Sequence, residues 1–575
     1  MKRMHFRYIL LAIFYFNAFG ITIFAQQENL YLNREKSLTF EKKLNQMDKA
    51  SFHSAIKPYI ASEVYDFVYP DSVIHYTKLQ KSDWFSKMVN VVGFENFLEF
   101  DENGYVKYRR DIVANPYLPT YNDVPSDTGY VNRKFYVAIN PIINIGMGVD
   151  FYTSKIISQR TVGFELKADI GKKVSLYTAI TNNVVKFPSY ITLYSVAATA
   201  VPGEGRTRPT SNNSFDYSSA IAYLSYSPVK QFNMQIGNGK HFIGDGFRSL
   251  LLSDNSFNYP YLQFTTNVWR IKYTTIYTEL LNNIKRGTDF TLGYQRKLAT
   301  FNYLSVDAAK WLQLGVFEGI TWRRTTDKGN TFFDYNFINP ILGVRAFQKK
   351  LNPNINKVYG TNIKVTLPKN IILYGQFAAQ SWGKKNTAKR KTAFQVGMKY
   401  FEVGNVPNLN LQVEFNQVRP FMYQGLDSLL SYSNYNQSIT HSMGANFREY
   451  LATLNYQWKR LYTSYKFNFT QAGYDFTGNF LNIENNGGNI LKAEKDIVNS
   501  MNVKMFNGTP YNIINNEFRI GYIINPKINF VAELGVQFRN YSSSSNDFTN
   551  FSSHSIGLSF KTNIFNRYYD LPVLF

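Results

Sequence analysis

The chain has 575 residues, a formal net charge of +23, 17% aromatic residues and no cysteine. The lack of cysteine excludes disulfides, thiolate metal sites and a cysteine nucleophile. High aromatic content with a mean hydropathy of −0.28 argues against a bundle of apolar helices. It is typical of membrane strands that have one face in lipid and one in water. The basic excess favours anionic partners, with ordinary solvated loops as the alternative.

Residues 1–25 have the pattern of a secretory signal peptide. An apolar stretch, 9–24, follows a positive segment and precedes the small residue Ala25; the positive segment contains Lys2, Arg3 and Arg7. We expect cleavage near Ala25, which leaves a formal charge of +20, with an uncleaved anchor as the alternative. No later segment has about 18 uninterrupted apolar residues, so no transmembrane helix is expected.

Residues 26–132 differ from the rest of the chain. They are mixed in character, with helix-like stretches at 35–47 and 50–67 and a proline-containing run near residues 116–125. We interpret them as a small mixed or helical periplasmic region. The barrel would then occupy residues 133–575.

From about residue 134 the hydrophobic pattern has a period of two. Apolar and polar residues alternate clearly in 162–170, 409–416 and 528–539. One face of such a strand meets hydrocarbon and the other a polar lumen. Segments of about 9–12 residues suit tilted membrane strands. The last strand is predicted at 555–565, before a terminal aromatic residue, Phe575.

The connections between these segments alternate in length. Short turns are predicted at 171–173, 228–229, 267–268, 307–310, 368–370, 404–407, 458–459 and 525–527. Mostly longer segments lie between them, at 149–157, 184–216, 241–258, 282–298, 325–354, 381–390, 420–446, 472–513 and 540–551. This pattern predicts an all-β, antiparallel transmembrane barrel of about eighteen strands with both ends in the periplasm. The loops 420–446 and 472–513 are long enough to fold inward as a plug.

Motifs for catalysis or metal binding do not emerge. The six histidines have no metal-ligand spacing, and the glycine-rich segment 237–246 lacks the βαβ context of a nucleotide site. Its glycines are expected to permit a bend at the barrel rim. Glu414 and Glu533 are expected in polar lumen networks. A hydrolase would need His441 to converge on Ser442 or Ser438, which sequence adjacency does not provide. We therefore predict no enzyme, cofactor or metal.

Basic residues gather in two predicted outer loops. They lie in the segment 383–391 and at Arg323, Arg324, Lys349 and Lys350. Beside aromatic rings, such residues could bind anionic sugar polymers through charge and stacking. Contact with lipopolysaccharide phosphates is the alternative. Nucleic acid is not expected at this location.

Several motifs in the barrel region are shared with one family. They lie at 53–59, 310–318, 338–340, 374–377, 397–401, 414–421, 434–437 and 441–447. With them the chain resembles the Bacteroidetes outer-membrane proteins described as gliding-motility RemB-like and grouped with the capsule-assembly Wzi family. The resemblance implies an eighteen-stranded barrel with a periplasmic helical part, and a role in holding capsular polysaccharide or in gliding. It carries no catalytic residues.

The functional prediction is a non-enzymatic outer-membrane barrel that binds or organises surface polysaccharide and supports gliding motility. The alternative is a passive or substrate-selective channel. The expected partners are outer-membrane lipid and lipopolysaccharide, surface polysaccharide, and other motility or envelope proteins. The residues selected for glycan binding or loop pinning are Lys240, Arg248, Asn416, Arg419, His441 and Asn446.

Overall fold

A computed structural model of the chain provides the structure. It describes residues 29–30, 38, 41–42, 52–60, 99–100, 106–107, 135–170, 173–210, 212–285, 293–324, 335–344, 355–368, 370–382, 388–475, 484–497, 502–525, 530–543, 550–562 and 568–572. The predicted signal peptide, Lys349, Lys350, most of the basic run 383–391 and Phe575 lie outside these residues.

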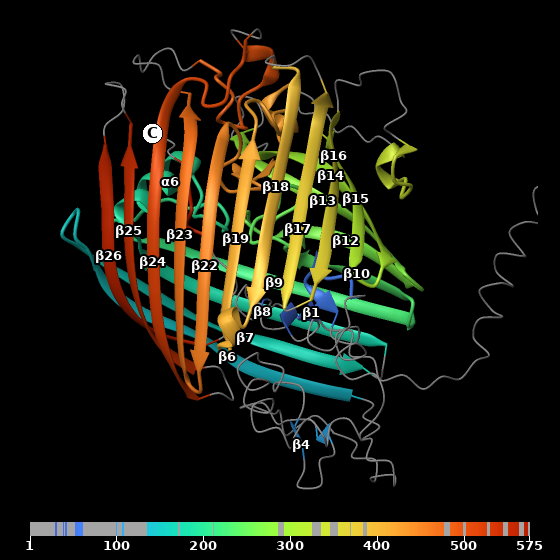
Figure 1. Cartoon of the computed structure of the whole chain (residues 1–575), viewed down its shortest axis with the longest axis horizontal. Helices are drawn as coiled ribbons and strands as arrows, with labels where there is room; N and C mark the ends of the chain where they lie inside the picture. Colours follow the sequence, from blue (N-terminus) through green and yellow to red (C-terminus); the bar gives the residue numbers. More distant parts are fainter. Residues whose placement is uncertain are drawn as a thin grey trace, which may run out of the picture.

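Eighteen antiparallel strands form a closed barrel, which confirms the predicted fold class (Figure 1). The strands are β6 (Phe135–Asp150), β7 (Lys155–Ile170), β8 (Val174–Lys186), β9 (Phe215–Val229), β10 (Phe232–Gly239), β12 (Tyr259–Val268), β13 (Ile271–Lys285), β14 (Tyr294–Ala309), β15 (Leu312–Arg323), β16 (Ile355–Leu367), β17 (Ile371–Trp382), β18 (Arg390–Phe401), β19 (Leu409–Val418), β22 (Phe447–Trp458), β23 (Leu461–Tyr474), β24 (Thr509–Asn525), β25 (Phe530–Ser542) and β26 (Phe551–Lys561). A closed ring leaves no unpaired edge in the membrane.

Smaller elements accompany the barrel. The only α-helix among the described elements, α6 (Ser189–Ala198), lies in the connection after β8. The short strands are β1 (Asn29–Leu30), β2 (Ile56–Lys57), β3 (Tyr59–Ile60), β4 (Glu99–Phe100), β5 (Val106–Lys107), β11 (Phe242–Ile243), β20 (Ser433–Asn434) and β21 (Gln437–Ser438). The 3-10 helices are η4 (Tyr335–Ile338), η6 (Val403–Asn405), η7 (Ser428–Leu430) and η8 (Glu494–Asp496). None of the described helices is long and apolar enough to cross a membrane.

The closing seam joins the last barrel strand to the first. Seven residue pairs connect β26 to β6, from Ser555–Asp150 to Lys561–Asn144. By contrast, sixteen pairs connect β6 to β7. The eight predicted short turns all fall at one end of the barrel, here called the turn end, and the longer connections fall at the opposite loop end.

The outer surface of the barrel is apolar, as the alternation predicts. On β25 and β26 the side chains of Leu534, Phe538 and Leu558 point outward and are 38%, 50% and 48% exposed. Their neighbours Glu533 and Ser555 point into the lumen and are buried. Burying these outward groups in water-free hydrocarbon is favourable, so the barrel has the surface of a membrane protein.

Replacing Leu558 by arginine is expected to destabilise the barrel by about 2–4 kcal/mol, because a cation would then face the hydrocarbon near mid-strand. Urea unfolding in lipid vesicles measures the change. Leu558→Val is the control and should stay within about 1.5 kcal/mol of the wild type. An arginine variant as stable as the valine variant would contradict the assignment of this face to lipid.

Two local predictions are wrong. The last strand is Phe551–Lys561 rather than 555–565, because Phe551 pairs with Tyr541 of β25 and stacks on its ring at 4.2 Å. In addition, the described part of the helix-like stretch 50–67 contains strands β2 and β3. Pairing of β2 with β11 and of β3 with β1 replaces the helix that the local pattern favours.

Candidate functional site in the barrel lumen

The lumen contains folded segments from distant parts of the chain. We call residues 52–60, 240–258, 419–446 and 568–572 the lumen plug. Strand β2 of the first segment pairs with β11 of the second. The third segment packs on the second, because the hydroxyls of Tyr423 and Tyr432 donate hydrogen bonds to the carbonyls of Leu250 and Leu251. Inward folding of the loop 420–446 is thus confirmed.

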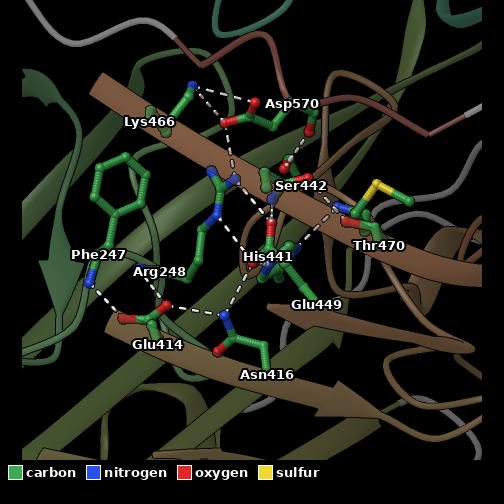
Figure 2. A network of polar contacts seen from close by, with 12 residues as sticks. Phe247, Arg248, Glu414, Asn416, His441, Ser442, Glu449, Lys466, Thr470 and Asp570 are labelled. Carbon is green, nitrogen blue, oxygen red and sulfur yellow. Dashed lines mark hydrogen bonds and ion pairs between the residues drawn. The ribbon is translucent and has the colours of Figure 1, made fainter. Parts of the chain in front are cut away.

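Glu414 on β19 holds the second plug segment against the wall. Its carboxylate accepts hydrogen bonds from the backbone N–H groups of Phe247 at 2.6 Å and Arg248 at 3.1 Å (Figure 2). Gly246 precedes them, and a Cβ there would lie 2.6 Å from the same carboxylate. Glycine is therefore required for the close approach to the wall, rather than for the rim bend predicted from the sequence.

Arg248 lies at the centre of a buried ion cluster and is 1% exposed. Its Nη2 is 3.0 Å from Glu449 Oε1 on β22 and 2.8 Å from Asp570 Oδ2 in the last plug segment (Figure 2). Burial alone would lower the pKa of Arg248, but the two carboxylates outweigh it and raise the pKa. The guanidinium thus remains charged and joins the barrel wall to the plug.

Asp570 forms ion pairs with three cations. Besides Arg248, Lys466 Nζ lies 3.1 Å from its Oδ2 and Arg539 Nη1 lies 3.7 Å from its Oδ1. Burial alone would raise the pKa of Asp570, but the field of Lys466, Arg248 and Arg539 lowers it. The Ser442 hydroxyl also donates to the Asp570 carbonyl at 2.6 Å. The C-terminal segment is therefore held as an anion among cations from two wall strands and the plug.

His441 completes the cluster as a hydrogen-bonding residue. The Met443 N–H donates to its Nδ1 at 3.1 Å, so Nδ1 accepts, and Nε2–H donates to Glu449 Oε2 at 2.6 Å. A neutral ring satisfies both bonds. Ser442 bonds to Asp570, and the Ser438 hydroxyl bonds to Thr440. Neither serine forms the pair with His441 that the hydrolase hypothesis requires.

The selected residues divide into two groups. Arg248, Asn416 and His441 meet at Glu449, whose Oε2 also accepts from Asn416 at 2.9 Å. Lys240, Arg419 and Asn446 lie elsewhere and bond to backbone carbonyls.

The second group forms hydrogen bonds between connections. Lys240 Nζ donates to the carbonyl of Gly203 at 2.6 Å, and Arg419 Nε to that of Arg390 at 3.1 Å. Asn446 donates to the carbonyl of Asn507 at 2.8 Å and accepts from the N–H of Phe506 at 2.8 Å. These contacts join connections at the loop end of the barrel.

Four ionic residues of the cluster were not selected from the sequence. They are Glu449, Lys466, Arg539 and Asp570. Glu449, Lys466 and Arg539 lie at inward positions of strands in which apolar and polar residues alternate, and that alternation could have identified them. Asp570 follows the last strand and carries no such signal. Glu414 and Glu533, which were expected in polar lumen networks, have separate partners, and Glu533 bonds to Lys561 and Tyr462.

His53 anchors the first plug segment. Its Nδ1 lies 2.8 Å from Ser305 Oγ, and its Nε2 lies 3.4 Å from Asp307 Oδ2. Burial lowers the pKa of His53 to about 3, and the nearby Lys272 and Lys364 add to the effect. Burial therefore outweighs the field of Asp245, which raises the pKa, and the ring is neutral near pH 7.

His53 is expected to make the stability depend on pH. The unfolded ring has a pKa near 6.5 and the folded one about 3, so the unfolded state binds the extra proton between these values. The free energy of unfolding should therefore fall as pH drops below about 6.5, by about 2–3 kcal/mol at pH 4. Urea titrations of the wild type and of His53→Gln at pH 7 and pH 4 measure it. Equal losses in both proteins would contradict this role.

A cavity of about 520 Å³ lies beside the plug, along the inner wall of β6–β8 and β22–β26. Its lining includes five charged wall residues, Lys466, Glu517, Arg519, Glu533 and Lys561. The aromatic rings of Phe247, Tyr568 and Tyr569 border it from the plug. Nothing lies within 4 Å of a Cβ built on Gly535, so this glycine faces open space. Polar groups beside rings suit a saccharide.

Among the described residues, no group of three or more histidine, aspartate or glutamate residues could hold a metal ion. The closed ring, apolar outer face and polar plugged lumen define the class of outer-membrane β-barrels. No protein-family model matches the chain, and no curated protein sequence does.

Solved structures resemble the chain in fold. Wzi, described as an outer-membrane protein involved in group 1 capsule assembly in Escherichia coli and as a carbohydrate-binding β-barrel, matches with a TM-score of 0.50 and 9% identity, covering 93% of this chain and 100% of its own. The outer membrane protein opdK of Pseudomonas aeruginosa has a TM-score of 0.41 and 9% identity, covering 74% and 98%. OccAB2 of Acinetobacter baumannii has 0.39 and 10%, covering 74% and 97%. At this identity the similarity to Wzi supports the barrel fold alone.

Proposed function

We propose that the protein is a non-enzymatic outer-membrane barrel that binds or organises cell-surface polysaccharide, including capsule, and in this way supports gliding motility. The observation that carries the proposal is the lumen plug, held to the wall by the buried ion cluster of Arg248, Glu449 and Asp570. A lumen filled by ordered chain favours binding at the site over passive flow.

The cavity beside the plug is the proposed saccharide site. The cations and carboxylates of its lining form ion pairs, Lys466 and Arg519 with Glu517, and Lys561 with Glu533. A saccharide would bond to both members of such a pair, its acidic groups to the cation and its hydroxyls to the carboxylate. Two of the basic residues expected in the outer loops are also paired, Arg323 with Asp427 and Arg324 with Glu279. The described part of the predicted basic loops is therefore partly neutralised.

Gly535→Trp tests this site, because the new ring would fill the open space in the cavity. Binding of purified protein to acidic capsular polysaccharide should weaken at least about tenfold, or about 1.4 kcal/mol. Leu534→Trp is the matched control, since it places the same ring on the lipid face. If both variants bind as the wild type does, the cavity is not the site.

A deletion strain tests the cellular role. Loss of capsule retention and slower gliding are expected, and both should return with the wild-type gene but not with Gly535→Trp. Normal capsule and normal gliding in the deletion strain would exclude the proposed function.

A substrate-selective channel is the second candidate function. The cavity of about 520 Å³ within the lumen favours it, because a small solute fits such a space. Planar-bilayer recording distinguishes the two: a stable open current in the wild type supports the channel, and its absence supports the binding protein.

A further inference from the structure

The outward face of β14 and β15 contains polar residues in the part nearer the loop end. On β15, Gln313 and Phe317 face the lumen, so Glu318 between Phe317 and Gly319 faces outward. Glu318 is nevertheless 0% exposed, whereas Leu314 and Val316 on the same face are 41% and 42% exposed. Asn302 of β14 pairs with Glu318 in register and donates to its Oε2 at 3.2 Å. A carboxylate in this position is costly in hydrocarbon unless it is covered.

The described part of the connection between β15 and β16 packs on outward residues of this same face. We call residues 335–344 the strap; in Figure 1 it is the yellow-green segment at the outer margin of the barrel. The ring of Phe337 packs on a buried cluster of Leu298, Ile320 and Trp322, which all face outward. Its centroid lies 5.4 Å from that of Tyr277 on β13. The strap therefore lies on the outside of the wall and not over the lumen.

Side chains of the barrel wall donate hydrogen bonds to backbone carbonyls of the strap. Thr300 donates to the carbonyl of Phe337 at 3.2 Å, Tyr277 to that of Ile338 at 2.7 Å, and Tyr273 to that of Pro340. Three outward hydroxyls thus bond to three strap carbonyls. An irregular segment in water has no need of such partners, but one at membrane depth does, because hydrocarbon supplies no hydrogen bonds.

The exposed side of the strap is mainly apolar, with Asn336 as its exposed polar residue. Ile338, Ile341 and Val344 are 58%, 60% and 42% exposed. Pro340 of the strap bonds to Tyr273, which Leu304 joins in register to the exposed Val316. We propose that the strap is embedded in the bilayer, where its three exposed apolar side chains contact lipid acyl chains and the covered wall can carry Asn302 and Glu318. This proposal is independent of polysaccharide binding.

Spin labelling tests the strap directly, because the chain has no cysteine and one introduced cysteine carries the only label. Ile341→Cys in lipid vesicles should relax with oxygen rather than with a water-soluble nickel complex. Leu314→Cys on the lipid face and Asn212→Cys in an exposed turn are the references for lipid and water. A response like that of Asn212→Cys would overturn the proposal. Protection from both reagents would also overturn it, in favour of a protein neighbour at this surface.

A stability cycle tests the covering role. Phe337→Ala should lower the midpoint of urea unfolding in vesicles, because it loosens the cover over the wall. The loss should be smaller when Glu318 and Asn302 are both leucine, since no polar pair then needs covering. Equal losses in the two backgrounds would show that the strap does not shield these residues.

Discussion

Asp570→Ala is expected to lower the free energy of unfolding by about 3–5 kcal/mol, one of the largest effects of any single substitution in the chain. The change leaves Arg248, which is 1% exposed, with only Glu449 as a carboxylate partner, and it leaves Arg539 without its ion pair. Lys466 keeps Glu517 at 2.8 Å. Removing one member of a buried ion cluster is more costly than the cluster is stabilising, because the remaining charge stays buried.

Urea unfolding of the full chain in lipid vesicles, followed by tryptophan fluorescence, measures this loss. Arg296→Gln is the matched control. The side chain of Arg296 is 50% exposed, so its ion pair with Glu279 should contribute less than about 1 kcal/mol to the free energy of unfolding. The loss in Asp570→Ala should shrink at acid pH. The folded pKa of Asp570 is lowered, so below the unfolded pKa the unfolded wild type binds a proton that the folded protein does not, and the stability that this carboxylate provides declines as the pH falls. Equal stability of Asp570→Ala and Arg296→Gln near pH 7 would contradict the role of Asp570 as the anion of the plug.

Replacing residues 420–446 by a short glycine–serine linker should open the lumen. The deletion removes Tyr423 and Tyr432, which bond to the second plug segment, and it removes His441 from the ion cluster. The linker joins β19 to β22, which are already neighbours in the barrel with ten residue pairs, so the wall can remain closed. A stable current in planar bilayers is expected where the wild type gives none.

The control for this deletion is a variant with the same chain length as the wild type in which only Tyr423 and Tyr432 become phenylalanine. It loses two hydroxyls but keeps the rings, so it should remain silent. Circular dichroism and resistance to unfolding in detergent establish that the deleted protein still forms the barrel. A folded deletion variant without conductance would show that residues 420–446 do not block the path through the lumen.

The barrel could be predicted in some detail because membrane strands obey a local rule. Alternation at positions such as Leu534 and Phe538 follows from contact with lipid on one side, and it needs no knowledge of distant residues. Where a second surface covers the wall, the rule fails. Glu318 interrupts the apolar face of the wall on which the strap packs, and Phe551 extends the last strand because it pairs with Tyr541.

The site could be predicted only in part. Asn416 and His441 stood out through family motifs, but nothing local indicates that Arg248 meets Asp570, 322 positions away in the chain. Such a contact depends on the return of the C-terminal segment into the lumen after the last strand. The same tertiary effect replaced a predicted helix with strand β2, since pairing with β11 satisfies its backbone.

The short seam between β26 and β6 has a consequence for the order of folding. Its seven pairs join residues about 400 positions apart, so closing it costs more chain entropy than forming any hairpin of the wall. Hairpins such as β6–β7, with sixteen pairs, are therefore expected to form early and the ring to close late. Residues 52–60 and 568–572 flank the first and last wall strands, so an open sheet could receive both before closure traps them inside.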